Sequence, residues 1–135
     1  MKTERALVLY DSDCGFCRWT LAKLLAWDRA EILRPVPIDS AEGRRLLDDL
    51  RPDERDASWH FVDAAGKRTS AGAAAPPLLR LLPGGRFPAA LLSRFPAATE
   101  RAYAWVARNR SAFGRPLPAK AKSRADALIR RREAA

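Results

Sequence analysis

Cys14 and Cys17 are the only cysteines in this chain of 135 residues, and two residues separate them. They follow a short apolar run, residues 6–10, of the kind that forms a buried strand. Residues three positions apart in the first turn of a helix have Cα atoms about 5 Å apart, which is close enough for a disulfide. The pair could serve thiol–disulfide exchange, act as two small buried apolar side chains, or supply half of a zinc site.

The surroundings of the pair favour the redox interpretation. The apolar spacing of Cys17, Leu21 and Leu24 predicts a helix from Cys14 to about Asp28, with these three side chains on one face. Cys14 would then lie at the N-terminus of the helix, where unpaired N–H groups and the helix dipole favour a thiolate. We therefore expect Cys14 to attack a substrate disulfide and the more buried Cys17 to resolve the mixed disulfide.

Two acidic residues precede the helix. Asp13 is expected to be its N-cap. Asp11 ends the apolar run and could accept the proton of Cys17 as a general base. Both carboxylates also bring negative charge, which disfavours a thiolate on Cys14, and both could act only as capping residues of the loop.

A metal site receives little support from the other residues. A closed zinc site needs four ligands, and two cysteines supply only half of them. His60 is the only histidine, and it lies far downstream in a strand-like run, where an ordinary half-buried histidine is the simpler interpretation. We therefore expect no metal and no cofactor, with electrons supplied by a cellular thiol system.

The remaining pattern predicts an α/β layer sandwich with the order β-α-β-α-β-β-α and an additional C-terminal helix. The expected elements are strands over 6–10, 32–38, 58–62 and 67–70, helices over 14–28, 41–50, 76–82 and 98–113, and a loop over 51–57. The prolines at 35 and 37 suit an edge strand. In a parallel βαβ unit, chemistry tends to lie beyond the carboxyl ends of the strands, which is where Cys14 follows the first strand.

The positive charge is concentrated at one end of the chain. The formal net charge is +9, but residues 1–100 are nearly balanced, so the excess of Lys and Arg lies in residues 101–135. We expect residues 116–135 to be a basic, solvated tail with one or two helical turns near 125–132. Such a segment could bind a polyanion, yet it lacks interleaved aromatic residues, a nucleic-acid docking motif and a one-sided apolar stripe for a membrane.

The composition is that of a folded domain, and it gives an expectation of location. No apolar run approaches the ~20 residues that cross a bilayer, and residues 1–13 show no signal-peptide cleavage pattern. We therefore expect a cytoplasmic protein without a transmembrane segment. In that compartment a lasting structural disulfide is uncommon, so a close cysteine pair more often indicates redox chemistry.

The Asp11-x-x-Cys14-x-x-Cys17 pattern resembles the DCC family, which is named for it and grouped with thioredoxin-like thiol-disulfide oxidoreductases. Two later blocks are similar as well, one over residues 72–84 and the other over 103–115 with its Asn-Arg pair. The resemblance implies that Cys14 and Cys17 are the redox pair and that Asp11 is the acid of the motif.

The resemblance also implies a thioredoxin-like domain over residues 1–115, followed by the basic tail. Two features depart from the pattern. Thioredoxin-like proteins usually place a cis-proline before the third strand, whereas Ala-Ser-Trp stands at 57–59 here and the nearest proline is Pro52. Pro76 and Pro77 interrupt the helix of the family's central block.

The sequence therefore predicts a thiol-disulfide oxidoreductase that acts on a protein or small-molecule thiol or disulfide. Two alternatives from other classes stay open. One is a non-catalytic thioredoxin-like interaction module whose cysteines are reduced and inert. The other is a nucleic-acid accessory protein that acts through residues 116–135, an interpretation that the missing docking motif makes unlikely.

Overall fold

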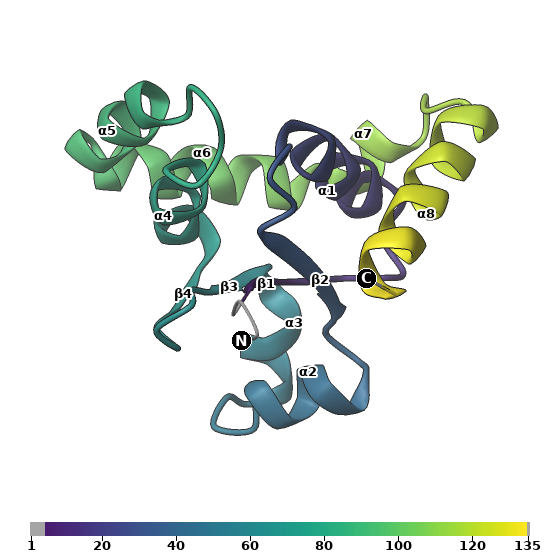
Figure 1. Cartoon of the computed structure of the whole chain (residues 1–135), viewed down its shortest axis with the longest axis horizontal. Helices are drawn as coiled ribbons and strands as arrows, with labels where there is room; N and C mark the ends of the chain where they lie inside the picture. Colours follow the sequence, from purple (N-terminus) through teal and green to yellow (C-terminus); the bar gives the residue numbers. More distant parts are fainter. Residues whose placement is uncertain (1–4, 135) are drawn as a thin grey trace.

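A four-stranded mixed sheet lies at the centre of the molecule, with helices on both of its faces (Figure 1). The computed structural model describes residues 5–134. The strands are β1 (Ala6–Tyr10), β2 (Leu33–Pro37), β3 (His60–Val62) and β4 (Arg68–Ser70), in the order β2-β1-β3-β4. β1 is parallel to β2 and antiparallel to β3, and β3 pairs with β4 in a hairpin. This is a mixed α/β fold compatible with the thioredoxin-like class.

Helices account for most of the remaining chain. They are α1 (Gly15–Trp27), α2 (Ala41–Leu46), α3 (Pro52–Ala57), the short 3₁₀ helix η1 (Ala71–Ala74), α4 (Ala75–Leu79), α5 (Arg86–Arg94), α6 (Pro96–Arg108), α7 (Arg110–Gly114) and α8 (Ala119–Ala134). Within residues 5–134, no helix combines the length and the apolar character that crossing a bilayer requires.

The alternation of side chains along β1 divides the core into two layers. Ala6, Val8 and Tyr10 point to one face and pack in the cluster formed with α1, α4 and α8. Leu7 and Leu9 point to the other face and pack against residues of α2 and β2. A strand that is apolar on both faces is therefore buried between two helical layers, as the uninterrupted apolar run predicted.

The position of β2 explains its prolines. Pro35 and Pro37 lie in the strand at one edge of the sheet, so the missing N–H groups do not interrupt a ladder between two neighbours. The prediction of an edge strand is confirmed, and the strand is one residue shorter at each end than expected. Pro76 and Pro77 likewise lie in the first turn of α4, where proline is tolerated.

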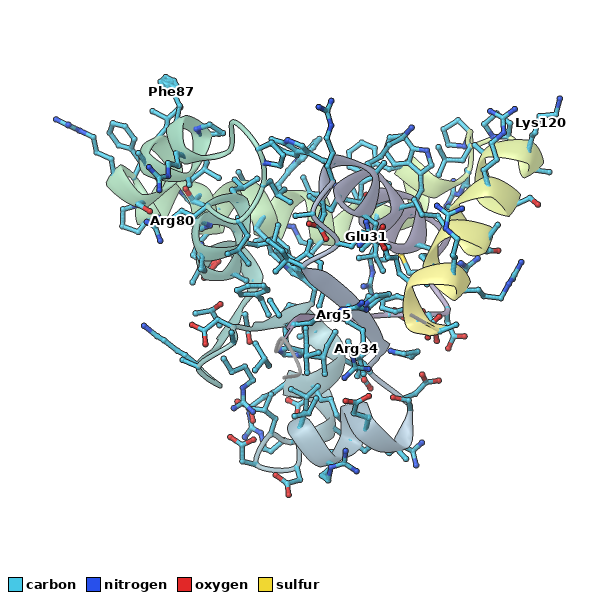
Figure 2. The ribbon with its side chains drawn as sticks, in the orientation of Figure 1. Arg5, Glu31, Arg34, Arg80, Phe87 and Lys120 are labelled. Carbon is cyan, nitrogen blue, oxygen red and sulfur yellow. The ribbon has the colours of Figure 1, made fainter. Side chains whose placement is uncertain are left out.

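The predicted loop over 51–57 is mostly a helix. Residues 52–57 form α3, because Pro52 suits the first helical position and Glu54 accepts a hydrogen bond from the N–H of Arg51. Further along the chain, α5 follows directly after the turn at Gly84 and Gly85. α5 carries apolar side chains on its outer surface, among them Phe87, which Figure 2 shows pointing away from the molecule and which is 71% exposed.

The helix predicted over 98–113 is interrupted at Asn109. The amide of Asn109 donates from Nδ2 to the carbonyl oxygen of Trp105 at 2.7 Å, and its backbone N–H also bonds to that turn. This side-chain bond competes with continued helix, as Asn bonds to nearby backbone commonly do. α6 therefore ends at Arg108, and α7 begins in a new direction.

The C-terminal segment is not the solvated tail that the charge pattern suggested. α8 lies alongside α1, as the yellow helix in Figure 1 shows, and Ala125 and Ile129 are buried against the core. Arg132 is buried as well and forms an ion pair with Asp28 at 3.0 Å. The prediction of one or two helical turns was wrong because an arginine that is part of the core cannot be told from a solvated one in a basic segment.

Candidate redox site

Cys14 is the N-cap residue of α1. It follows the carboxyl end of β1, and its extended backbone (φ −102°, ψ 112°) leads into the helix that begins at Gly15. Its sulfur accepts a hydrogen bond from the backbone N–H of Cys17 at 3.2 Å. The sulfur thus takes the place of the oxygen that usually satisfies a free N–H group in the first turn, an arrangement that stabilises a thiolate.

Asp13 is not the helix cap, and that prediction was wrong. Its carboxylate is exposed, and its backbone N–H donates to Oδ1 of Asp11 at 3.0 Å. The two aspartates therefore close the loop by a local side-chain turn, while the cysteine one position later caps the helix. The sequence could not decide between adjacent capping residues, because a thiol is rarely considered for this role.

Cys17 lies one turn into α1. Both cysteines are free thiols and partly exposed in the structure. Burial first, and then the neighbouring Cys14, raise the pKa of the Cys17 thiol to about 12, while the Arg110 guanidinium acts in the opposite direction. A protonated Cys17 beside an N-capping Cys14 is the asymmetry that the sequence suggested for a resolving and an attacking thiol.

Arg110 joins the two parts of the motif. Its Nη1 lies 3.7 Å from the sulfur of Cys17, and its Nη2 lies 3.5 Å from Oδ2 of Asp11. The guanidinium thus bridges the acid and the second cysteine, although Arg110 and Cys17 are 93 positions apart in the chain. Arg110 was not among the predicted site residues, and its place in the Asn-Arg block was the only signal that could have selected it.

Aromatic packing holds α7 against α1 and so positions Arg110. The rings of Phe16 and Phe113 lie 5.3 Å apart between centroids, and Phe113 also contacts Trp105 at 5.5 Å. Gly114 also lies close to α1, since a Cβ on it would be 3.4 Å from the backbone nitrogen of Phe16. The turn at Asn109 and this aromatic cluster together place the guanidinium over Cys17.

A largely apolar cleft of about 380 Å³ reaches from Cys17 into the molecule. Its walls are α1 and α6, and its floor includes Val8, Tyr10 and Trp59. Cys17, Asp11 and Arg110 line it, so the cleft borders the second cysteine and the motif acid together. A concave apolar site with a few polar groups has the usual character of a binding site.

Trp59 lines the same cleft as Cys17, and two hydrogen bonds hold it in place. The N–H of Trp59 donates to the hydroxyl of Tyr103 at 3.2 Å, and its indole Nε1 donates to the carbonyl of Ala71 at 3.0 Å. Among the bonds between residues 5 and 134, no peptide bond is cis. Where thioredoxin-like proteins use a cis-proline, this chain therefore has a hydrogen-bonded tryptophan.

A second, more polar hollow of about 370 Å³ lies on the Cys14 side of Arg110. The charged side chains around it come from three segments: Asp11 and Asp13 before α1, Arg110 and Arg115 around α7, and Lys122 of α8. Cys14 itself lines this hollow, whereas Cys17 lines the apolar cleft. The two sulfurs therefore border different environments with Arg110 between them.

His60 is not brought to the cysteine pair. It is buried in β3, where Nδ1 contacts the hydroxyl of Ser70 at 2.6 Å and Nε2 contacts the carbonyl oxygen of Arg55 at 3.0 Å. Burial lowers the pKa of its imidazole. Both ring nitrogens are therefore engaged within the fold, in line with the interpretation of an ordinary histidine. Within residues 5–134, no three His, Cys, Asp or Glu side chains are grouped as metal ligands.

Comparison with known proteins bears directly on this site. The model of the family described as DCC1-like thiol-disulfide oxidoreductase matches residues 8–116, which include the cysteine pair, Asp11 and Arg110. The matched range ends before α8. The searches of curated proteins and of solved structures gave no match.

Proposed function

Because the chain belongs to the DCC1-like thiol-disulfide oxidoreductase family, we propose that it exchanges dithiol and disulfide through Cys14 and Cys17. One observation carries the proposal: the sulfur of Cys14 caps α1 and lines an open hollow, and Cys17, whose backbone N–H donates to that sulfur, lies one turn further into the helix. A thiolate is stabilised where it accepts a backbone N–H, and exchange needs one accessible and one resolving thiol.

The reaction begins at Cys14. Its thiolate attacks one sulfur of a substrate disulfide, forms a mixed disulfide and displaces the other half of the substrate as a thiolate that takes up a proton. Cys17 then loses its proton and attacks the Cys14 sulfur, releasing the second thiol. The substrate gains two electrons, the cysteine pair becomes a disulfide, and a cellular thiol system returns it to the dithiol form.

Asp11 and Arg110 support the second step. Asp11 is the carboxylate that lines the cleft beside Cys17, so we assign it the role of proton acceptor for that thiol. Arg110 contacts both groups, holds the carboxylate in place and stabilises the negative charge that develops on the Cys17 sulfur. Both assignments are hypotheses about rate and are tested below through the lifetime of the mixed disulfide.

The test is to trap the mixed disulfide with a neutral disulfide of low molecular weight, hydroxyethyl disulfide. Purified Cys17→Ser protein should accumulate one hydroxyethylthio adduct on Cys14, because nothing resolves it. Cys14→Ser protein should react far more slowly, since partial burial raises the pKa of its remaining thiol and keeps that thiol protonated. Intact mass and peptide mapping identify the adduct and its position.

The outcomes separate the competing interpretations. Adducts on Cys14 alone in the Cys17→Ser protein support the assignment of attacking and resolving thiols. Faster labelling of Cys17 in the Cys14→Ser protein would reverse the roles. If neither variant reacts at a rate above that of a free cysteine peptide, the exchange reaction is rejected and an interaction module with inert cysteines becomes the better explanation.

A further inference from the structure

The family match ends at residue 116, yet α8 brings charge to the redox site. The aliphatic chain of Lys122 lies over Gly15, with Cε 3.6 Å from the point that a Cβ on that glycine would occupy. Gly15 is the residue directly after Cys14. The 3.6 Å spacing is that of an ordinary van der Waals contact, so the side chain of Lys122 lies beside the N-terminus of α1.

The cations around the Cys14 hollow are only partly neutralised. Arg110 pairs with Asp11 at 3.5 Å. Arg115 and Lys122 form no ion pair with any residue between 5 and 134. The one other carboxylate of the hollow is the exposed Asp13, so the charges around Cys14 sum to a net positive value, to which the N-terminus of α1 adds.

From these observations we infer that the Cys14 hollow binds the carboxylate of a small anionic thiol or disulfide, with Arg115 and Lys122 as its recognition residues. This inference rests on the proposed function and names its substrate class. The half of the substrate that stays on Cys14 in the mixed disulfide would place its carboxylate between the two cations. The volume of about 370 Å³ is that of a small-molecule site.

The electron balance is that of ordinary exchange. A symmetric disulfide carrying a carboxylate on each half accepts two electrons from the Cys14–Cys17 dithiol and leaves as two thiols. The cations do not take part in bond breaking. They raise the local concentration of the anionic substrate and hold its reacting sulfur near Cys14, an effect that salt weakens.

The experiment compares three disulfides of similar size in the Cys17→Ser background. Dithiodipropionate carries a carboxylate on each half, hydroxyethyl disulfide is neutral, and cystamine carries an ammonium on each half. The rate of adduct formation on Cys14 is measured for each by quenching and intact mass. Rates are expressed relative to the neutral disulfide, which removes any change in the reactivity of the thiol itself.

Removing the two cations should change the preference of the protein for the anionic over the cationic disulfide, with little effect on its rate with the neutral one. In the Arg115→Gln, Lys122→Gln double variant the relative rate of dithiodipropionate should fall about fivefold and that of cystamine should rise, as expected for two charges a few ångströms from the ligand in high dielectric. Lys120→Gln is the matched control, because Lys120 lies in the same helix but points into solvent at the edge of the molecule (Figure 2). It should leave all three relative rates unchanged.

Two further variants and a change of ionic strength keep the result interpretable. Lys122→Arg keeps the charge and should retain the preference, and Arg115→Gln alone tests the cation that does not pack on α1. Raising the ionic strength should shrink the preference of the protein that retains both cations. Equal relative rates with and without the cations, at low and high salt, would overturn the inference while leaving the proposed exchange intact. Failure of all three disulfides to react would instead reject the exchange itself.

Discussion

The two ends of α1 differ in how their charges are used. At the C-terminal end, Asp28 is fully enclosed, accepts hydrogen bonds from the N–H groups of Ile32 and Leu33, and pairs with the buried Arg132. At the N-terminal end, Cys14 borders an open hollow with cations that have no carboxylate partner. At the C-terminal end the buried charges of Asp28 and Arg132 pair with each other, whereas at the N-terminal end two cations of the hollow have no carboxylate partner among residues 5–134.

α8 contributes to both ends because it runs beside α1 in the same direction. Lys122 lies near Gly15, and Asp126 pairs with Arg18 at 2.8 Å in the middle. Arg132 donates to three backbone carbonyls as well as to Asp28 at the far end. The comparison indicates that the closed end fixes the helix in place and that the open end is where a ligand can complete the pairing.

The largest expected effect comes from breaking the closed end. Arg132→Met should lower the free energy of unfolding by about 3 kcal/mol, because it leaves the carboxylate of Asp28 buried without its cation. The loss should lie at the lower end of the range for buried pairs, since two backbone N–H groups still solvate that carboxylate. Urea unfolding followed by tryptophan fluorescence measures it.

The neighbouring arginine provides the control for this variant. Arg131 is exposed, so Arg131→Met removes the same charge and should change the free energy of unfolding by less than about 0.5 kcal/mol. If both variants lose equally little, the buried pair does not anchor α8, and the contrast between the two ends of α1 fails.

A smaller and different effect is expected at the open end. Arg110→Gln should slow resolution of the Cys14 mixed disulfide about threefold, since loss of the guanidinium raises the pKa of Cys17 and lowers its thiolate fraction, while the greater nucleophilicity of the more basic thiolate partly compensates. Asp11→Asn should slow the same step if its carboxylate takes the proton. Decay of a hydroxyethyl mixed disulfide in protein with both cysteines is the readout, and Arg108→Gln, on the exposed face of α6, is the control.

The same decay should depend on pH in a defined direction. In the mixed disulfide Cys14 carries no charge, but burial, the largest cause of the raised pKa of Cys17, persists. Below that pKa the thiolate fraction rises tenfold with each pH unit, so decay should accelerate about a hundredfold between pH 7 and 9. A decay rate that does not change over this range would contradict this expectation and would mean either that Cys17 is already ionised or that a carboxylate such as Asp11 removes its proton during the attack.

Patterns within a short stretch of sequence were enough to predict those parts of the site whose residues lie close together in the chain. The apolar run, the Cys-x-x-Cys spacing and the helical periodicity after it identified β1, α1 and the place of the two thiols in the first turn of that helix, while the roles of the thiols stay a prediction. The prolines of β2 predicted its edge position, because a missing N–H has a direct geometric consequence. Each of these features depends on residues within one or two elements.

The features that sequence missed depend on contacts between distant elements. Arg110 reaches Cys17 only because Asn109 turns the chain and Phe113 packs on Phe16. α8 was taken for a tail because its segment has few apolar residues, whereas its stability comes from a buried arginine and small side chains. Periodicity counts apolar residues and cannot recognise a cation that is paired inside the fold.

The most direct test of the central claim is a redox titration of the purified protein. The protein is equilibrated in glutathione or dithiothreitol buffers of graded potential, and free thiols are counted by alkylation and mass spectrometry, with Cys14→Ser and Cys17→Ser alongside. We predict one reversible transition in which both thiols disappear together as a two-electron couple, whereas neither variant can form the internal disulfide and Cys17→Ser protein can lose its thiol only as a mixed disulfide with glutathione. A pair that stays reduced and unreactive across the whole range would contradict the proposed exchange.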